Sequence, residues 1–381
     1  MDSISKQPLA GINVFLSNTS IGAISDEKGE FIIQQIPQGK FELIASSLNY
    51  ETHVSIIQSA GKALSLTIQM KPSANILQEV VVESYDRNGW AKWGDYFKNN
   101  FIGAPSLSKD CKLLNPDILH FKLNSKTNTV RAFAHEKLIF ENRALGYRIS
   151  YLLIKFEFDI TNNSFKYVGY PLFENLVPLN LDEQKKWESA RTATYHGSLM
   201  HFMRSLYSNQ LLEEGFEVKA MKKITGEERT RVKKLFKKMD EPARTLLNKD
   251  SLEYYNKVSK LSFTDDTVIL SKLLPRDSIV FPVDESIEPG AVFFEFDDIL
   301  HITYLHKKEP AAYTRLLLKR PDRDFISSDL SLPNKKGVSV FRNGNYFYGE
   351  NIFTDGFWAW SEKLATMLPS DYWPAKKDET Y

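Results

Sequence analysis

Alternation of apolar and polar side chains over the first 70 residues is the feature that most constrains the fold of this chain. Runs with a period of two occupy residues 12–16, 30–34, 40–45 and 64–70. This period places every second side chain on one face of a strand, and strands at intervals of about ten residues are typical of a sandwich. The sequence therefore predicts a β-sandwich over residues 1–72.

Turn-forming residues separate these runs. The segment from Asp26 to Gly29 is predicted to close one hairpin, in which Asp26 accepts hydrogen bonds from local backbone amides rather than binding a metal. Pro37 and Gly39 are predicted to close the next turn, and both glycines are expected at φ values that few other residues adopt. We interpret all four residues as structural.

The rest of the chain alternates between strand and helix patterns. Residues 73–110 are predicted to be a linker and connecting segment, and residues 111–381 a β-rich domain of unknown function. Asn343-Gly344 carries the strongest hairpin signal in the chain. Helices are predicted in three places: near residues 180–214, near residues 227–248 and over residues 358–367. The fold class is therefore mainly β with α insertions, that is α+β.

One residue is predicted to begin the first of these helices, and another to kink or end the second. Asn180 is a favourable N-cap, with Glu183 three residues later as its capping-box partner. Pro242 is predicted to kink or end the second helix, because proline lacks the amide hydrogen that an interior position requires.

Charge and cysteine content exclude several classes. Lys plus Arg number 49 and Asp plus Glu 48, so the whole chain has no net field to attract nucleic acid or anionic lipid. The basic residues over 229–238 are predicted to form the solvated face of a helix. Nucleic-acid binding is the minor alternative, because the acidic residues Glu227, Glu228 and Asp240 flank them. The single cysteine, Cys111, excludes an internal disulfide and a Cys-cluster metal site. No segment reaches the roughly 18 apolar residues of a membrane helix.

No motif in the chain supplies a complete catalytic or metal-binding set. His135-Glu136 begins an HExxH motif, but Ile139 stands where the second histidine should be. His306 and Glu309 match the HxxE pair of zinc carboxypeptidases, yet no histidine follows to provide the third ligand that catalytic zinc requires. We therefore predict no catalytic, cofactor-binding or metal-binding residue, and a protein that is not an enzyme.

His196 and His201 are five residues apart in the first predicted helix. On a continuous helix this spacing separates the two rings by about 140° around the axis. The two histidines are therefore predicted not to share a metal.

Aromatic residues are concentrated near the C-terminal end, over residues 346–360. Tyr346, Tyr348, Trp358 and Trp360 are candidates for stacking on a sugar or peptide ligand. The alternative, that this cluster belongs to an ordinary core, is preferred.

A set of ordered motifs in the first 50 residues suggests a family. The motifs are Pro8-Leu-Ala-Gly-Ile-Asn-Val-Phe-Leu16, Gly22-Ala-Ile-Ser-Asp26, Gly29-Glu-Phe31, Ile36-Pro-Gln-Gly39, Phe41-Glu-Leu43 and Ser47-Leu-Asn-Tyr50. Together they resemble the carboxypeptidase regulatory-like domain, a transthyretin-like β-sandwich, although Asn49 stands where the family usually has glycine. This domain is an accessory module, and the resemblance implies no peptidase activity.

The resemblance also implies a setting for the protein. Such domains form the N-terminal extension of TonB-dependent outer-membrane receptors in Bacteroidetes-type bacteria, and Leu77 to Val82 is similar to the strip that follows the domain there. The remaining ~300 residues are too few for a receptor plug and a 22-stranded barrel. The resemblance thus implies a periplasmic or outer-membrane-associated protein, with an envelope protein or a glycan as partner.

Three functions remain open at this point. The leading hypothesis is a non-catalytic cell-envelope protein that acts in binding or structural assembly. The alternatives are a carbohydrate- or peptide-binding protein of a nutrient-uptake system and an unrecognised hydrolase.

The N-terminal end carries one further expectation. In the resembled domain a first strand precedes the turn that corresponds to Pro8-Leu-Ala-Gly11, and an export signal precedes that strand. We therefore expect the first strand of the sandwich to lie upstream of Met1, preceded by a signal of about 15–30 residues.

Overall fold

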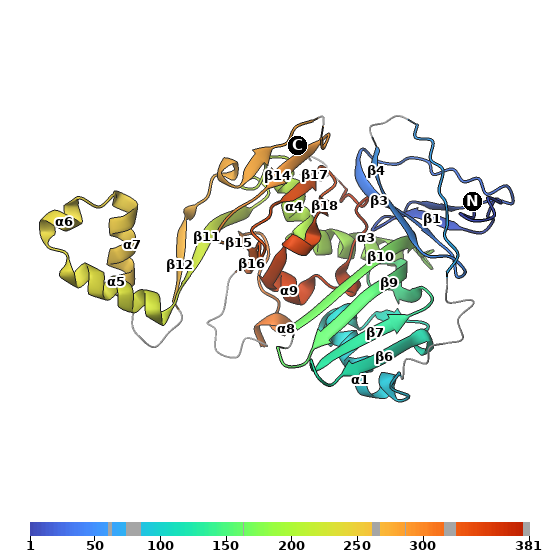
Figure 1. The fold of residues 1–381 in the computed structure, drawn as a ribbon, viewed down its shortest axis with the longest axis horizontal. Helices are drawn as coiled ribbons and strands as arrows, with labels where there is room; N and C mark the ends of the chain where they lie inside the picture. The colour runs from blue at the N-terminus through green and yellow to red at the C-terminus, as the bar shows by residue number, and fades with distance from the viewer. Residues whose placement is uncertain are drawn as a thin grey trace.

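The computed structural model describes residues 1–59, 63–73, 85–162, 164–260, 267–285, 287–315 and 325–375. Within these residues the chain forms four antiparallel sheets with helices packed between and beside them (Figure 1). The predicted fold class, mainly β with α insertions behind an N-terminal sandwich, is confirmed. None of the helices in these ranges has the length and apolar character needed to cross a membrane.

The first sheet belongs to the N-terminal sandwich and has the strand order β2-β1-β3-β4. Its strands are β1 (Asn13–Leu16), β2 (Gly22–Ile24), β3 (Gly39–Ser46) and β4 (His53–Ser59). Alternate side chains of β1 and β3, among them Val14, Leu16 and Phe41, form its core. The period-two pattern thus identifies the core-facing residues, but Phe15 and Ile44 on the opposite face are buried too.

Two other runs of the sandwich differ from the prediction. The segments around Phe31 and Leu64 are not strands in the structure, and only isolated bridges join the second to its surroundings. Ile68 and Met70 are nevertheless buried in the sandwich core. Leu64 and Leu66, which share their alternation, are exposed. Alternation therefore found only part of the buried face, and a strand also requires a neighbouring backbone at hydrogen-bonding distance.

The second sheet contains six strands, in which β9 pairs with β7, β8 and β10. They are β5 (Cys111–Leu113), β6 (Leu119–Asn124), β7 (Thr129–Ala134), β8 (Leu138–Asn142), β9 (Tyr147–Asp159) and β10 (Ser164–Asn175). The helical segments that precede or interrupt it are α1 (Gly89–Phe97), the π-helix η2 (Lys98–Ile102), α2 (Pro105–Ser108) and the 3-10 turn η3 (Pro116–Ile118).

The second half of the predicted linker and connecting segment, residues 73–110, packs on the second sheet. Phe97, Phe101 and Ile102 are buried in the core of the second sheet, where Phe101 stacks edge-on against Tyr151. Helix α1 and η2 are therefore part of this domain, because the sheet needs an apolar layer to cover its inner face.

Two further sheets and their helices complete the body. The five-stranded sheet has the order β12-β11-β15-β16-β19, and the four-stranded sheet β13-β14-β17-β18. Their strands are β11 (Phe216–Ile224), β12 (Thr267–Leu273), β13 (Val280–Pro282), β14 (Ala291–Phe294), β15 (Ile299–Tyr304), β16 (Ile326–Ser331), β17 (Val338–Phe341), β18 (Tyr346–Phe347) and β19 (Phe353–Gly356). The predicted Asn343-Gly344 hairpin joins β17 to β18 and is confirmed.

The helices of this region are shorter and more numerous than predicted. They are α3 (Leu181–Tyr195), α4 (Leu199–Tyr207), α5 (Gly226–Lys238), α6 (Glu241–Thr245), α7 (Lys249–Ser259), α8 (Ala311–Thr314) and α9 (Phe357–Ser361), with 3-10 turns η4 (Arg276–Ser278), η6 (Gly349–Asn351) and η7 (Leu364–Thr366). The predicted C-terminal helix is thus α9 followed by η7.

Breaks within the two predicted central helices have local causes. The first breaks at Gly197, whose φ of 81° ends α3, and Ser198 then caps α4. The second breaks after α5, where Asp240 caps α6 and Pro242 occupies its first turn. The capping prediction at Asn180 is confirmed, because its side chain accepts a hydrogen bond from the Glu183 amide.

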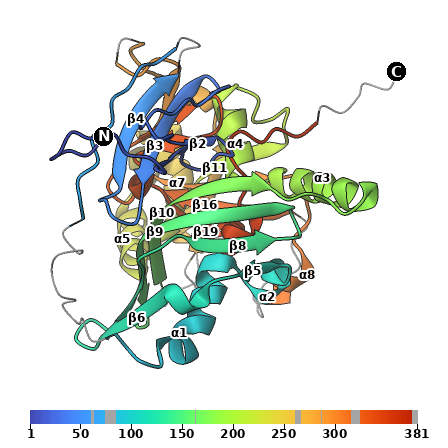
Figure 2. The same cartoon turned by 90° about the vertical axis from the view of Figure 1, so that its right-hand side faces the viewer.

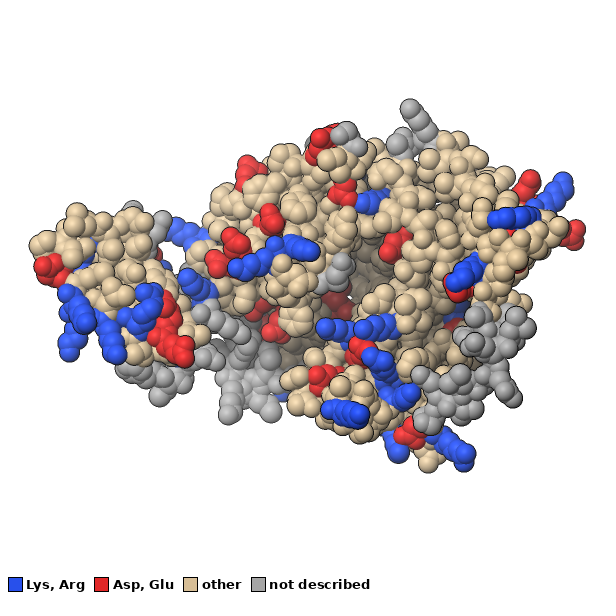
Figure 3. Space-filling model, in the orientation of Figure 1, with Lys and Arg blue, Asp and Glu red and all other residues tan. Residues whose placement is uncertain are grey.

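Helices α5 to α7 form an arm that projects from the body on the β11–β12 pair (Figure 1). The arm has its own small apolar cluster, centred on Ile224, Val232 and Val258. The space-filling view shows it standing clear of the rest of the molecule (Figure 3).

The sandwich is held against the body by backbone hydrogen bonds. The Asn18 amide donates to the Pro171 carbonyl at 2.8 Å, and the Phe173 amide donates to the Thr19 carbonyl at 2.9 Å. The view in Figure 2 shows β10 and β9 passing beneath the sandwich strands. The loop between β1 and β2 thus forms an isolated parallel β-bridge with β10, in which Thr19 lies opposite Leu172.

Candidate functional site

The four turn residues singled out in the sequence lie in the sandwich loops. Asp26 Oδ1 accepts hydrogen bonds from the amides of Lys28 and Glu30, at 2.9 and 2.8 Å. Gly29 has a φ of 74° and Gly39 a φ of 145°, both in the region that favours glycine. Pro37 lies two residues before β3 and lines the groove described next.

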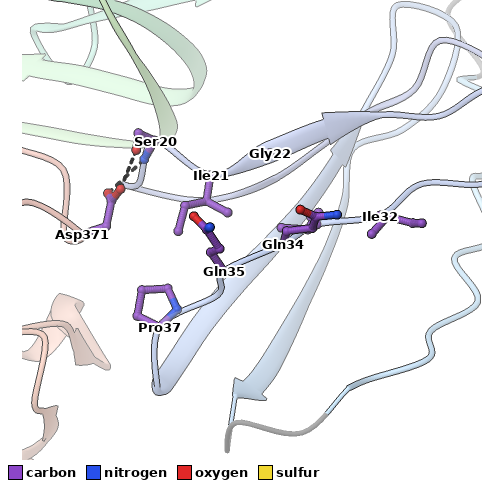
Figure 4. Close-up of a pocket in the computed structure, with 9 residues that line it drawn as sticks. Ser20, Ile21, Gly22, Ile32, Gln34, Gln35, Pro37 and Asp371 are labelled. Atoms are coloured by element: carbon purple, nitrogen blue, oxygen red, sulfur yellow. Dashed lines mark hydrogen bonds between the residues drawn. The ribbon is translucent and has the colours of Figure 1, made fainter.

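An open groove of about 580 Å³ lies where the sandwich meets the C-terminal segment (Figure 4). One wall is β2 with the residues before it, and the other is the segment that leads to β3. Asp371 closes one end, where its carboxylate accepts hydrogen bonds from the Ser20 amide at 3.0 Å and the Ser20 hydroxyl at 2.5 Å. The lining residues are Ser20, Ile21, Gly22, Ile32, Ile33, Gln34, Gln35, Pro37 and Asp371.

The β2 wall is an edge strand, since β2 is the outermost strand of its sheet. Two hydrogen bonds to the β1 side flank the strand. The Ile21 carbonyl accepts a hydrogen bond from the Leu16 amide, and the Ser25 amide donates one to the Ile12 carbonyl. Because alternate residues of an edge strand bond inward, the backbone groups of Gly22 and Ile24 point away from β1. An edge of this kind can accept the backbone of another extended chain.

Two exposed isoleucines accompany this edge. Ile24 on β2 is 66% exposed and Ile32 on the opposite segment is 77% exposed. Groove and edge therefore combine free backbone groups with apolar side chains and with the amides of Gln34 and Gln35. Periodicity alone did not single out this site, because it arises from residues that flank different strands.

The aromatic candidates near the C-terminal end do not form a ligand-binding surface together. Trp358 is buried in the core of the body and donates its indole N–H to the Gly197 carbonyl at 2.9 Å. Tyr346 and Trp360 are half-buried against the same core, whereas Tyr348 is exposed. The interpretation as core holds for Trp358 and fails for Tyr348.

Tyr348 instead lies beside a contact between the sandwich and the body. The Lys40 ammonium group lies 4.8 Å from the centre of the Phe347 ring and 6.0 Å from that of Tyr348. Lys40 also forms a 2.5 Å ion pair with Glu288, and both side chains are only 13% exposed. Burial opposes ionisation of Glu288, but hydrogen bonds from Lys40 and Ser339 lower its pKa below the usual value. This contact fixes the sandwich to the four-stranded sheet.

A second charged cluster lies in the body around Glu362, which no sequence motif marked. The Glu362 carboxylate accepts a hydrogen bond from the Leu199 amide, at the start of α4, at 3.1 Å. Burial raises the pKa of Glu362 to about 7, against the opposing effects of Leu199, Lys307 and Lys363. Burial also lowers the pKa of Lys363 to about 8, and its ammonium group lies 3.9 Å from the centre of the Phe165 ring.

The histidines are distributed over several small contacts. The argument that His196 and His201 lie far apart is wrong, because the helix breaks between them and their ring centres are 5.2 Å apart. The Gly197 amide donates to His201 Nδ1, so the other nitrogen carries the hydrogen directed at Glu214, 3.0 Å away. Burial lowers the pKa of His201 to about 4, and the ring is neutral.

The remaining histidines do not assemble a metal site in the part of the chain that the structure describes. His301 Nδ1 lies 2.7 Å from the Asp329 carboxylate on the neighbouring strand. His306 and Glu309 lie in the segment between β15 and α8, and His135 is between β7 and β8. No group of three or more His, Cys, Asp or Glu residues with metal-binding geometry occurs among the described residues.

The fold and the groove define a class of protein: a β-sandwich domain mounted on a larger β-rich body, with an open edge strand beside a groove. Residues 1–82 match the family of the CarboxypepD_reg-like domain, which assigns the sandwich to that family. The search of curated proteins found no match for the chain, and the search of solved structures found none either.

Proposed function

We propose that this chain is a non-catalytic protein of the bacterial cell envelope that binds an extended segment of a partner protein in the groove beside β2. The exposed edge of β2 supports this most directly, because the backbone groups of Gly22 and Ile24 point away from β1 and Gly22 lines the groove. Addition of a strand to a sheet edge gives affinity through main-chain hydrogen bonds and specificity through alternate side chains. The location in the periplasm or at the outer membrane rests on the resemblance of the sandwich to receptor extensions.

The chemistry of the groove favours a peptide over a glycan. Its lining residues combine isoleucines with glutamine amides and contain no aromatic side chain. Sugar-binding sites rely on aromatic faces for stacking, and Trp358, the most buried of the aromatic candidates, serves the core. An extended peptide with apolar side chains at alternate positions matches the edge strand and its exposed isoleucines.

The test is an array of immobilised heptapeptides in which apolar and polar residues alternate, with rearranged peptides of the same composition as reference. The wild-type protein should prefer the alternating set. Ile24→Lys should weaken that binding about tenfold, since it adds a charge beside the bound strand. Ile56→Lys is the matched control, because Ile56 is 58% exposed on β4, at the opposite edge of the same sheet.

Three results would contradict the proposal. The first is equal binding of both peptide sets, the second is equal loss in both variants, and the third is binding to a glycan array that Ile24→Lys abolishes while peptides are ignored. The third result would favour the carbohydrate-binding alternative.

A hydrolase is the second candidate function, and the Glu362 cluster is the observation that favours it. A carboxyl group with a pKa of about 7 can donate or accept a proton at neutral pH. The hydrogen bond from Leu199 also gives Glu362 a structural role at the start of α4. Peptide or glycoside hydrolysis that Glu362→Gln abolishes, with the fold intact, would support this candidate and contradict a non-catalytic role.

A further inference from the structure

Charge is unevenly divided between the arm and the rest of the chain. Residues 222–260 contain twelve Lys and Arg against six Asp and Glu, whereas the remainder contains 37 against 42. The arm and its base therefore carry a net charge of +6 and the remainder −5. The expectation that the chain is not attracted to anionic surfaces was based on its nearly neutral total charge. That total conceals the separation of charge between the arm and the remainder.

Lysines occupy the outer face of α5. Val232 is buried in the small core of the arm, and Lys234, Lys237 and Lys238 lie on the opposite side of the helix. All three are exposed, and among the described residues none of them forms an ion pair. Figure 3 shows Lys and Arg side chains along the lower edge of the arm, with acidic side chains beside them.

Other basic residues of the arm are paired internally. Arg231 binds Glu228 at 2.6 Å, and Lys257 binds Glu253 at 2.9 Å. These pairs lie within α5 and within α7 and engage two of the six acidic residues of this region. Lys234, Lys237 and Lys238 remain available to an external anionic partner.

The far end of the arm carries an exposed apolar residue. Leu246 directly follows α6, which lies at the end of the arm farthest from the sandwich (Figure 1). Its side chain is 88% exposed, as much as any large apolar side chain in the described residues. Exposure of a leucine side chain to water is unfavourable, whereas insertion into the interface of a bilayer would bury it.

We propose that the arm docks the protein on an anionic lipid surface, with the α5 lysines against the headgroups and Leu246 inserted among them. Basic side chains near an anionic surface and one inserted apolar side chain are the two elements of peripheral membrane binding. The negative charge of the remainder orients the molecule, because it is repelled by the surface that attracts the arm. A nucleic acid or an acidic protein would use the lysines but would leave Leu246 exposed.

Sedimentation with vesicles tests the charge requirement. The full chain should bind vesicles of phosphatidylglycerol and phosphatidylcholine, and binding should fall with added salt and be absent on phosphatidylcholine alone. The triple variant Lys234→Glu, Lys237→Glu, Lys238→Glu should lose at least tenfold in vesicle affinity. The matched control is Lys126→Glu, Lys185→Glu, Lys186→Glu, which makes the same charge change at exposed positions of the body and should lose far less.

Fluorescence tests the insertion of Leu246. An environment-sensitive dye on Leu246→Cys should shift to shorter wavelength on the anionic vesicles, while the same dye on Leu212→Cys, an exposed position of the body, should not. The native Cys111 is buried and its thiol pKa is raised to about 12, so it does not compete for the dye. Circular dichroism checks that each variant is folded.

The proposal is overturned if wild-type protein ignores the vesicles, or if both triple variants lose affinity equally. Binding without a dye shift at position 246 would overturn the insertion. Binding of an RNA homopolymer or polyglutamate, with no binding to vesicles, would assign the lysines to a different partner.

Discussion

A single buried charged residue, Arg204, joins the C-terminal segment to the body, where no sheet hydrogen bonds connect them among the described residues. Arg204 on α4 donates to the carbonyls of Asn343, Ser370 and Tyr372 at 2.9 to 3.0 Å. Its guanidinium also stacks 3.7 Å from the centre of the Trp373 ring. One cation therefore holds the C-terminal segment, which in turn brings Asp371 to the groove. Planar guanidinium groups suit this task because they donate in several fixed directions.

Glu362 should make stability depend on pH in a defined window. Its pKa rises from an ordinary 4.5 to about 7 on folding, so the folded state binds its proton more tightly. That contribution is fully present below pH 4.5 and is lost as the pH rises to 7. Relative to Glu362→Gln, the wild-type protein should lose on the order of 3 kcal/mol of unfolding free energy across this window.

Urea unfolding at pH 4.5, 6 and 7.5 measures this difference between wild type and variant. Glutamine keeps an oxygen that can accept the Leu199 amide, so the comparison isolates the titration. Parallel pH dependence in the two proteins would show that Glu362 keeps its ordinary pKa in the fold.

At the scale of elements, the arm differs from the sheets in how it is stabilised. Its buried cluster comprises only Ile224, Val232 and Val258, with Tyr254 and Tyr255 beside it. The sheets of the body share much larger cores. A unit with few buried apolar contacts opens at lower free energy than the cores to which it is attached. The arm should therefore unfold at a lower free energy than the sheets of the body.

Val232→Ala tests this difference. Removal of two methyl groups should cost about 2 kcal/mol within the arm, and amide exchange should accelerate in α5 and α7 while the sheets keep their protection. Val340→Ala is the control, because Val340 is fully buried in β17 and its loss should lower the stability of the body. If Val232→Ala lowered protection everywhere, the arm would belong to the main cooperative unit.

At the scale of the whole molecule, the sandwich is attached to the body on two sides. On one side the loop between β1 and β2 bonds to β10 and, through Asn18, to Ser370. On the other side Lys40 enters between Glu288 and Phe347. Gln58 adds a hydrogen bond to the Pro289 carbonyl at 3.1 Å. Attachment at separated points resists rotation, so the groove keeps its shape between the two domains.

Lys40→Ala should weaken this attachment. It leaves the Glu288 carboxylate partly buried without its cation, which should cost about 2 kcal/mol and separate the unfolding of the sandwich from that of the body in calorimetry. Lys71→Ala is the matched control, because its pair with Glu51 is 69% and 49% exposed and should contribute well under 1 kcal/mol. Equal effects of the two substitutions would mean that the Lys40 contact does not hold the domains together.

Local sequence pattern determined much of the secondary structure of this protein. The alternation of Val14 and Leu16 placed β1, and Asn343-Gly344 placed the β17–β18 hairpin. Asn180 located the start of α3. These features depend on residues that are neighbours in the chain, so that the steric and hydrogen-bonding preferences of a few side chains decide them. The resemblance of the first residues to one domain family rests on the same kind of local order.

Contacts between distant parts of the chain decided the candidate sites. Ser20 and Asp371 meet across 351 positions to close the groove, and Lys40 meets Glu288 across 248. The raised pKa of Glu362 follows from burial that its neighbours in sequence do not cause. The segment around α1 looked like a linker because its apolar face has a partner only in the folded sheet. Such features depend on which surfaces pack together, and only the tertiary structure specifies that.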